Sequence, residues 1–100
     1  MEVKFELGNL KFEWDSEKAE INYKKHKIKF EDAALVFFDD FKIDEFDELH
    51  SDFEDRYKII GKVENILVVI YTERGDFTRI ISARPAEKRE ANRYYGQFYD

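Results

Sequence analysis

The sequence predicts an α+β domain, in which an antiparallel β-sheet carries an N-terminal hairpin, two short helices after the hairpin and a C-terminal helix packed on the sheet. Three observations lead to this fold class. Two alternating runs flank a tight turn near the N-terminus, strand-like segments occupy residues 56–83, and helical periodicity appears at 17–26, at 30–38 and after Pro85. The length of 100 residues fits a single domain spanning residues 1–100.

The N-terminal hairpin is predicted for residues 3–14. Apolar and polar residues alternate on both sides of Gly8-Asn9, a dipeptide that is typical of two-residue hairpin turns. The apolar faces of the two strands are formed by Val3, Phe5, Leu7, Leu10, Phe12 and Trp14. Trp14 is therefore interpreted as a core residue.

Two short helices are predicted after the hairpin. Asp15-Ser16 offers an N-cap for a helix that runs from about Glu17 to Lys25 or His26. Its apolar stripe is formed by Ala19, Tyr23 and His26. A neighbouring polar stripe is formed by Lys18, Asn22 and Lys25. The second helix covers residues 30–38, with apolar side chains at Phe30, Ala33, Ala34, Phe37 and Phe38.

An acidic stretch follows at residues 39–55. It holds nine acids and one lysine, a local charge of −8, whereas residues 56–93 hold nine bases and five acids, a local charge of +4. A basic surface is therefore expected in a protein whose net charge is −6. The spacing of an EF-hand, with its central glycine, is absent, so the stretch is interpreted as a solvated flank. Within it, a short edge strand is predicted from Phe41, Ile43 and Phe46.

Three further strands are predicted, with tight turns at Glu64-Asn65 and Gly75-Asp76 between them. Their ranges are 56–63, 66–72 and 77–83. The middle strand is apolar on both faces and is expected to be central. Pro85 cannot donate to a β-ladder but fits the first turn of a helix, so the C-terminal helix is expected to begin there. The residues expected to dock that helix on the sheet are Ala91, Tyr94, Tyr95 and Phe98.

Several classes of protein are excluded by composition. The sequence contains no cysteine, which rules out a disulfide framework and a zinc-thiolate site. No apolar run reaches the ~18 residues of a membrane span, and the N-terminus lacks the apolar segment of a signal peptide. These features favour a cytoplasmic protein with no membrane partner. No tight cluster of metal ligands is visible, so neither a metal nor another cofactor is expected.

Arginine is well suited to binding phosphate because its planar guanidinium donates two hydrogen bonds at once. Arg79 and Arg84 are the candidates for stabilising a reacting phosphate. They are five positions apart, so a regular strand would place them on opposite faces unless a bulge or Pro85 turns the chain. Arg84 with Lys88 is an alternative clamp at the helix start. The residues expected to contact the backbone or a base of a nucleic acid are Lys25, Tyr57, Arg74, Lys88, Arg89 and Arg93.

His26 and His50 are the side chains that normally titrate near neutral pH. His26 ends the first helix among lysines and is the candidate for proton transfer, with capping of that helix as the alternative. His50 lies in the acidic stretch and is interpreted as a structural residue that holds the loop. Lys88, Arg89 and Arg93 serve equally well as the docking face for a protein partner.

Three blocks of residues, spread over about residues 11–95, point to a family. The first block is Phe12-Glu13-Trp14-Asp15, Lys18, Asn22, Lys25-His26 and Phe30-Glu31-Asp32-Ala33. The second is Asp47, His50-Ser51, Glu54, Arg56-Tyr57 and Ile60-Gly61. The third is Thr72-Glu73-Arg74-Gly75-Asp76, Arg79-Ile80-Ile81-Ser82-Ala83-Arg84, Ala86, Glu90 and Arg93-Tyr94. In this order and spacing they resemble the signature of the BrnT toxins.

The resemblance implies a RelE-like fold and the ribonuclease toxin of a type II toxin–antitoxin system. Such a toxin is an endoribonuclease of the mRNA interferase type, which inhibits translation by cutting RNA. With no metal site expected, the cleavage would be metal-independent. The resemblance also implies neutralisation by a BrnA-like antitoxin, and contact with DNA only through that antitoxin. The catalytic residues would then be His26, Arg79 and Arg84.

The sequence departs from the family pattern in three places. The first eleven residues look like an extra strand. Lys27 stands where glycine is usual, and a lysine in a left-handed helix cap costs about 1 kcal/mol, so a different turn is expected. Ala91 stands where a further arginine is common, which weakens the basic helix.

The alternative function is a non-catalytic RNA- or partner-binding module. Catalysis by His26, Arg79 and Arg84 requires that the three side chains converge on one phosphate, so their placement distinguishes the two hypotheses. A DNA-binding domain is disfavoured, because the net charge is negative and no helix-turn-helix pattern is present.

Overall fold

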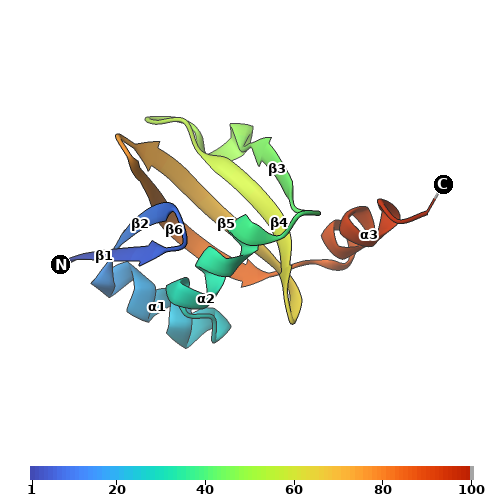
Figure 1. Ribbon diagram of the computed structural model, residues 1–100, viewed down its shortest axis with the longest axis horizontal. Helices are drawn as coiled ribbons and strands as arrows, with labels where there is room; N and C mark the ends of the chain where they lie inside the picture. Colours follow the sequence, from blue (N-terminus) through green and yellow to red (C-terminus); the bar gives the residue numbers. More distant parts are fainter. Residues whose placement is uncertain (100) are drawn as a thin grey trace.

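The computed structural model describes residues 1–99 and has the α+β fold that the sequence predicts (Figure 1). A six-stranded sheet runs in the order β1-β2-β6-β5-β4-β3. The strands are β1 Glu2–Leu7, β2 Leu10–Asp15, β3 Ile43–Phe46, β4 Tyr57–Val63, β5 Asn65–Arg74 and β6 Phe77–Pro85. The helices are α1 Ser16–His26, α2 Phe30–Ala33 and α3 Lys88–Gly96, and two 3₁₀ turns are η1 Ala34–Phe38 and η2 Glu48–His50. No helix among the described residues is long and apolar enough to cross a membrane.

The N-terminal hairpin forms as predicted, around a two-residue turn at Gly8-Asn9. Gly8 has a φ of 60°, a conformation that glycine adopts without steric cost. The sequence alone predicts antiparallel pairing throughout, but β2 and β6 run parallel through Phe12↔Thr78 and Glu13↔Arg79. These two strands are joined by most of the chain rather than by a hairpin, so no tight turn fixes their relative direction.

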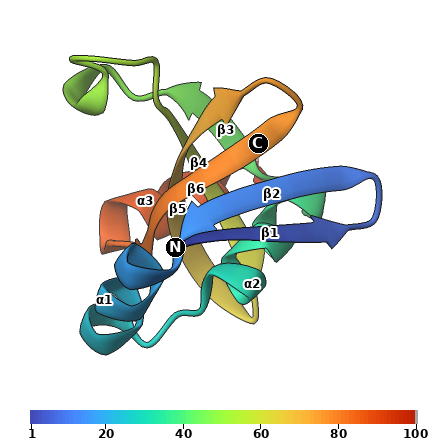
Figure 2. The ribbon, with the colours of Figure 1, turned by 90° about the vertical axis from the view of Figure 1, so that its left-hand side faces the viewer.

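Two apolar cores cover opposite faces of the sheet, because adjacent residues of a strand point to opposite sides. On β5, Val69 belongs to the larger core with α2 and η1, whereas Val68 belongs to the smaller core with Tyr94 of α3. Figure 2 shows α1 and α2 below the sheet and α3 at its left. We call the face that carries Val68 and Ile70 the α3 face.

Helix α1 begins at the predicted N-cap, where the Lys18 N–H donates to the Asp15 carboxylate at 3.1 Å. Its buried residue, however, is Asn22, while Tyr23 is exposed, so the predicted stripe is wrong at this position. The Asn22 amide donates to the Ala83 carbonyl at 2.9 Å and accepts from the Ala83 N–H at 3.1 Å. β2 pairs with β6 only at Thr78 and Arg79. Further along β6, the Asn22 side chain makes the hydrogen bonds to Ala83 that a neighbouring strand would otherwise make.

Residues 30–38 form α2 followed by a 3₁₀ turn rather than one helix. The three-residue period of this turn buries Val36 and exposes Phe38, in contrast to the pattern expected from a period of 3.6. Lys27 keeps a left-handed helix cap, with a φ of 60° and an N–H that donates to the Tyr23 carbonyl at 2.8 Å. The expected change of turn at this lysine is therefore wrong.

A bulge in β6 places Arg79 and Arg84 on the same face. The register shifts between Ile70, which pairs with Ser82, and Tyr71, which pairs with Ile80, so that Ile81 is the extra residue. Arg79 pairs with Thr72 and Arg84 with Val68, and these two β5 residues share the α3 face. The sequence allows the two arginines to share a face if a bulge or Pro85 turns the chain, and the structure contains the bulge.

The C-terminal helix starts later than predicted. Strand β6 continues through Pro85, and α3 begins at Lys88 after the Glu87 N–H donates to the Glu90 side chain at 2.8 Å. This contact satisfies one of the N–H groups that a helix start leaves without an internal partner. Of the predicted docking residues, Tyr94 is buried and Ala91 is partly buried, whereas Tyr95 and Phe98 are exposed.

Candidate functional site

A pocket on the α3 face joins residues of the 47–56 loop, β4, β5 and β6. It has a volume of about 260 Å³. Its charged and polar lining residues are Asp47, His50, Arg56, Lys58, Ser82 and Arg84. We call it the histidine pocket. Cations can stabilise negative charge on a bound anion, and a histidine beside them can transfer a proton.

The loop at 47–56 is closed at its base by hydrogen bonds. The Asp47 N–H donates to the Arg56 carbonyl at 2.8 Å. The Ser51 hydroxyl donates to the Asp47 carbonyl at 2.6 Å and accepts from the Arg56 N–H at 3.0 Å. Thr72 of β5 donates to the Asp55 carbonyl at 2.7 Å. These contacts fix an irregular segment that has little apolar core of its own.

Within this loop, Asp47 and His50 form a close pair. The distance between Asp47 Oδ2 and His50 Nδ1 is 2.7 Å. The Asp47 side chain is 8% exposed and that of His50 is 60% exposed, so a buried carboxylate holds a ring that reaches solvent. The predicted structural role of His50 agrees with this contact, but its place in the histidine pocket gives it access to a ligand.

Arg84 and Lys58 are both held by one carboxylate, that of Glu90. Both terminal nitrogens of Arg84 donate to it at 2.8 Å, and Lys58 Nζ lies at 3.1 Å. The hydrogen bonds from Arg84 outweigh the effect of burial and lower the pKa of Glu90 to about 2. The same contact is the main reason why the pKa of Arg84 is raised. The Glu90 carboxylate therefore holds both cations in place at the pocket wall.

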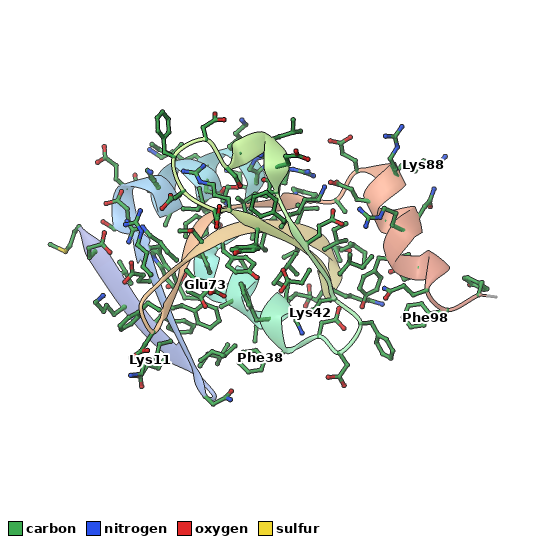
Figure 3. The ribbon with its side chains drawn as sticks, turned by 90° about the horizontal axis from the view of Figure 1, so that it is seen from above. Lys11, Phe38, Lys42, Glu73, Lys88 and Phe98 are labelled. Carbon is green, nitrogen blue, oxygen red and sulfur yellow. The ribbon has the colours of Figure 1, made fainter. Side chains whose placement is uncertain are left out.

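Further cations extend from this pocket along α3. An adjoining cavity of about 630 Å³ is lined by Lys58, Glu87, Lys88, Arg89, Glu90 and Arg93. Arg93 donates two hydrogen bonds to Glu45, at 3.1 and 2.9 Å. Within residues 1–99, neither Lys88 nor Arg89 forms an ion pair. Figure 3 shows Lys88 pointing away from the start of α3.

Arg79 shares the α3 face with Arg84 but is bound at another place. It donates to Glu2 at 2.6 and 2.8 Å and to Glu13 at 2.9 Å, and its side chain is only 12% exposed. These contacts raise the pKa of Arg79, and the largest cause is the hydrogen bonding that Arg79 donates to Glu2. Arg79 therefore fastens the N-terminal hairpin to β6 in this structure.

His26 is not among the residues that line the histidine pocket. It ends α1, whose Ala19 packs on the larger core, on the face of the sheet opposite to Arg84. Lys25, beside it, is exposed. The structure thus brings together Arg84, Lys58 and His50, and does not bring His26 to them.

The remaining predicted contact residues lie away from this group. Arg74 pairs with Glu54 at 3.2 Å. The ring of Tyr57 stacks on Tyr71, with 5.4 Å between ring centroids, and meets Phe46 edge to face. Stacking of Tyr57 on a base would have to compete with these rings.

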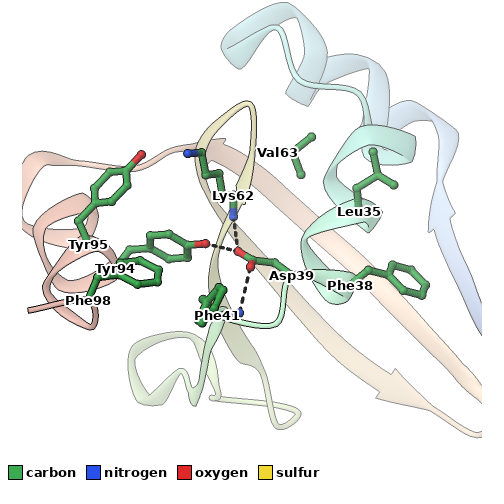
Figure 4. Close-up of a pocket in the computed structure, with 9 residues that line it drawn as sticks. All are labelled: Leu35, Phe38, Asp39, Phe41, Lys62, Val63, Tyr94, Tyr95 and Phe98. Atoms are coloured by element: carbon green, nitrogen blue, oxygen red, sulfur yellow. Dashed lines mark hydrogen bonds between the residues drawn. The ribbon is translucent and has the colours of Figure 1, made fainter.

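A larger groove, of about 460 Å³, lies between η1, β4 and α3 (Figure 4). Exposed apolar side chains line much of it, namely Leu35, Phe38, Phe41, Tyr95 and Phe98. Its carboxylate, Asp39, accepts hydrogen bonds from the Tyr94 hydroxyl and from the N–H groups of Phe41 and Lys62. Burial raises the pKa of Asp39, but these bonds outweigh it and the net pKa is lowered. The groove anchors α3 and lacks the cation cluster of the histidine pocket.

Of the residues at the site, the sequence nominates Arg84 and gives His50 only a structural role, and it misses Asp47, Arg56, Lys58 and Glu90. Asp47, Arg56 and Glu90 stand in the family blocks, and that position was the available signal. Lys58 carries no local signal, because a lysine that alternates with apolar strand residues is usually a solvated side chain. Among the described residues, no group of three or more His, Cys, Asp or Glu is arranged to hold a metal ion.

The mixed sheet and the cations on its α3 face define a small α+β protein with a surface suited to binding an anion. Residues 14–90 match the family described as the ribonuclease toxin, BrnT, of type II toxin–antitoxin systems, and the chain belongs to this family. It is thus a ribonuclease toxin, and its family implies an RNA substrate and an antitoxin partner. The resemblance seen in the sequence is confirmed.

A solved structure supports the same relationship. The crystal structure of the Brucella abortus ribonuclease toxin BrnT is similar, with a TM-score of 0.58 and 26% sequence identity. The match covers 75% of this chain and 94% of that chain. No curated protein matches the sequence. The family match starts at residue 14, so β1 and most of β2 precede it, in agreement with the extra strand expected from the sequence.

Proposed function

We propose that the protein is a single-domain endoribonuclease of the mRNA interferase type, which inhibits translation by cutting RNA on its α3 face without a metal ion. The observation that carries this proposal is the convergence of Arg56, Lys58 and Arg84 with a histidine in one pocket. Three cations beside one phosphate offset the charge that develops on the pentacoordinate phosphorus.

The RNA backbone is proposed to run from the histidine pocket along α3. Lys58 lines both cavities, so the two adjoin at this lysine. Lys88 and Arg89 contact phosphates directly, whereas Arg93 must first leave Glu45, with which it forms a partly exposed pair. Such a pair is worth little, so a phosphate replaces the carboxylate at small cost.

The three residues that the sequence nominates for catalysis have different roles in this proposal. Arg84 contacts the reacting phosphate. Arg79 reaches RNA only if the half-exposed Glu2 releases it. His26 lies with α1 on the other side of the sheet and would act only through a rearrangement of α1, so it serves as the comparison residue below.

The antitoxin partner is proposed to be BrnA-like and to cover the α3 face, where its acids meet the same cations that hold RNA. DNA contacts the toxin only through this antitoxin. A cytoplasmic location follows from the proposal, because translated RNA is found there.

The test is cleavage of end-labelled messenger RNA in EDTA, both as naked RNA and in a translating extract. Wild type is compared with Arg84→Gln/Glu90→Gln, which removes both charges of the pair and leaves no buried carboxylate without a partner. Glu20→Gln/Lys24→Gln, which removes both charges of an exposed ion pair on α1, is the matched control. We expect cleavage by wild type and by the control, and a loss of at least about tenfold in the double variant.

Absence of cleavage by folded wild type in both assays would contradict the proposal. It would favour the alternative, a non-catalytic RNA- or partner-binding module. Cleavage that stops in EDTA and returns with a divalent cation would contradict metal independence alone.

A further inference from the structure

We propose that His50 takes the proton from the RNA 2′-hydroxyl during cleavage and that Asp47 is the residue that positions its ring. The inference rests on the proposed ribonuclease function and assigns the proton-transfer group within the same pocket. It replaces the expectation, made from sequence alone, that His50 holds the acidic loop and that His26 transfers the proton.

The first support is the place of His50. Its ring lines the cavity that Arg56, Lys58 and Arg84 also line, so one bound phosphodiester can meet the histidine and the cations together. Proton transfer requires the acceptor within hydrogen-bond reach of the reacting hydroxyl. In the structure only one of the two histidines of the chain, His50, lines this pocket.

The second support is the orientation of the ring. A carboxylate accepts hydrogen bonds and cannot donate them, so the contact of 2.7 Å requires that Nδ1 of His50 donates to Asp47. In a neutral ring the other nitrogen, Nε2, then has its lone pair available as a proton acceptor. Because the side chain is 60% exposed, this nitrogen is reachable by a ligand.

The third support is the buried part of the pair. Asp47 is 8% exposed, and its backbone is fixed by Arg56 and Ser51 at the base of the loop. An acid that only keeps a loop soluble would be exposed to water. Burying a carboxylate costs free energy unless the carboxylate is hydrogen-bonded, as Asp47 is to His50. The arrangement is what a positioning residue for a histidine requires.

A fourth observation is a buried hydrogen-bond donor without a partner on another residue of the same pocket. The Nε atom of Arg56 is buried and has no hydrogen-bond partner among the described residues. Its Nη2 contacts Glu54 at 3.5 Å, the outer limit of a hydrogen bond. A phosphate oxygen in the histidine pocket would give the guanidinium of Arg56 a closer acceptor.

The proposed reaction needs no reactant other than RNA, and water only relays a proton. The 2′-oxygen attacks the adjacent phosphorus, the O2′–P bond forms and the P–O5′ bond breaks. The 2′ proton passes to Nε2 of His50, and the leaving 5′-oxygen takes a proton from water. The proton later released by His50 neutralises the hydroxide that remains. The products are a 2′,3′-cyclic phosphate and a 5′-hydroxyl.

The test uses the full-length protein and the labelled RNA substrate that wild type cuts. His50→Ala is compared with His26→Ala, and both are checked for an unchanged thermal melt. Loss of a general base lowers the rate by about 10²–10⁴-fold, so we expect that loss in kcat for His50→Ala with little change in KM. His26→Ala should cut at close to the wild-type rate.

Added imidazole distinguishes chemistry from structure. It should restore part of the His50→Ala rate in proportion to its concentration, and should not raise the rate of wild type or of Arg84→Gln/Glu90→Gln. The Asp47→Asn variant should lower kcat and leave KM almost unchanged. In its ¹⁵N spectrum, the neutral His50 ring should no longer be found only as the tautomer with the proton on Nδ1.

Wild-type rates in His50→Ala would overturn the assignment and leave the ribonuclease function in place. A loss in His50→Ala that imidazole does not restore would overturn it too, because it would assign His50 a structural role. An Asp47→Asn variant with normal kcat would overturn the positioning role of Asp47. A wild type that cuts neither naked nor translated RNA would overturn the proposed function and this inference with it.

Discussion

Arg84 and Glu90 face each other through two parallel hydrogen bonds, each of 2.8 Å, that link β6 to the first turn of α3. The same carboxylate accepts from the Glu87 N–H at 2.8 Å and lies 3.1 Å from Lys58. One acid therefore organises the helix start and two cations of the histidine pocket. An anion that enters the pocket meets both cations already in place, so little of its binding free energy is lost in ordering them.

Replacement of Glu90 by glutamine should destabilise the fold. The change leaves Arg84 and Lys58 without their shared counter-charge. Loss of one partner from a fully buried pair costs about 3–5 kcal/mol, and the partial exposure of the two cations places the expected loss at the lower end of that range. Urea unfolding at neutral pH measures this loss. Glu45→Gln, at the more exposed pair with Arg93, is the control and should cost less than about 1 kcal/mol. Equal losses in the two variants would refute the central place given to Glu90.

The stability should also depend on pH through Glu90. Its pKa falls from 4.5 to about 2 on folding, because the ionised form is stabilised by Arg84. A lowered pKa adds stability that is fully present above pH 4.5 and is lost as the pH falls toward 2. The difference in unfolding free energy between wild type and Glu90→Gln should therefore shrink between about pH 5 and about pH 2.5. A difference that stays constant over this range would contradict the assignment.

Asn22→Ala should be costly although the residue stands on a stripe that looks polar and solvated. It removes the two hydrogen bonds to the backbone of Ala83 and leaves a buried N–H and carbonyl unsatisfied, which costs about 1–3 kcal/mol for each group. Chemical denaturation compares it with Tyr23→Ala, an exposed neighbour that should lose less than about 1 kcal/mol. If Asn22→Ala were as stable as Tyr23→Ala, the role of Asn22 as a strand substitute would be wrong.

The salt dependence of RNA binding should locate the phosphate contacts. Each contact to single-stranded RNA contributes about 0.7 to the slope of log K against log salt. Lys88→Ala and Arg89→Ala should each reduce the slope by about that amount, while Lys25→Ala should leave it unchanged. Fluorescence anisotropy with a non-cleavable 2′-O-methyl RNA gives the slopes. A reduced slope for Lys25→Ala alone would move the RNA path to the α1 side.

The features that the sequence predicts well are those encoded locally. The hairpin around Gly8-Asn9, the helix start at Asp15 and the strand turns rest on short-range backbone preferences, and each is present. The edge position of β3 likewise follows from a short, weakly apolar segment in an acidic stretch.

The features that it misses depend on partners far along the chain. Asn22 is buried because β6 lacks a strand neighbour at Ala83, 61 residues away. Arg79 is bound to Glu2, 77 residues away, and no local sequence pattern indicates that pair. For the site, the chemistry of arginine is enough to nominate Arg84. To choose between His26 and His50, one must know on which face of the sheet each histidine lies, and only the structure gives this.

The most direct test of the account is to map bound RNA on the protein by amide NMR, with the same 2′-O-methyl RNA. We predict shifts and line broadening at Lys58, Arg84 and Arg89, together with the 47–56 loop. Signals of α1, including Lys25 and His26, should stay in place. Changes concentrated on α1, with the α3 face unaffected, would contradict the claim that RNA is bound and cut on the α3 face.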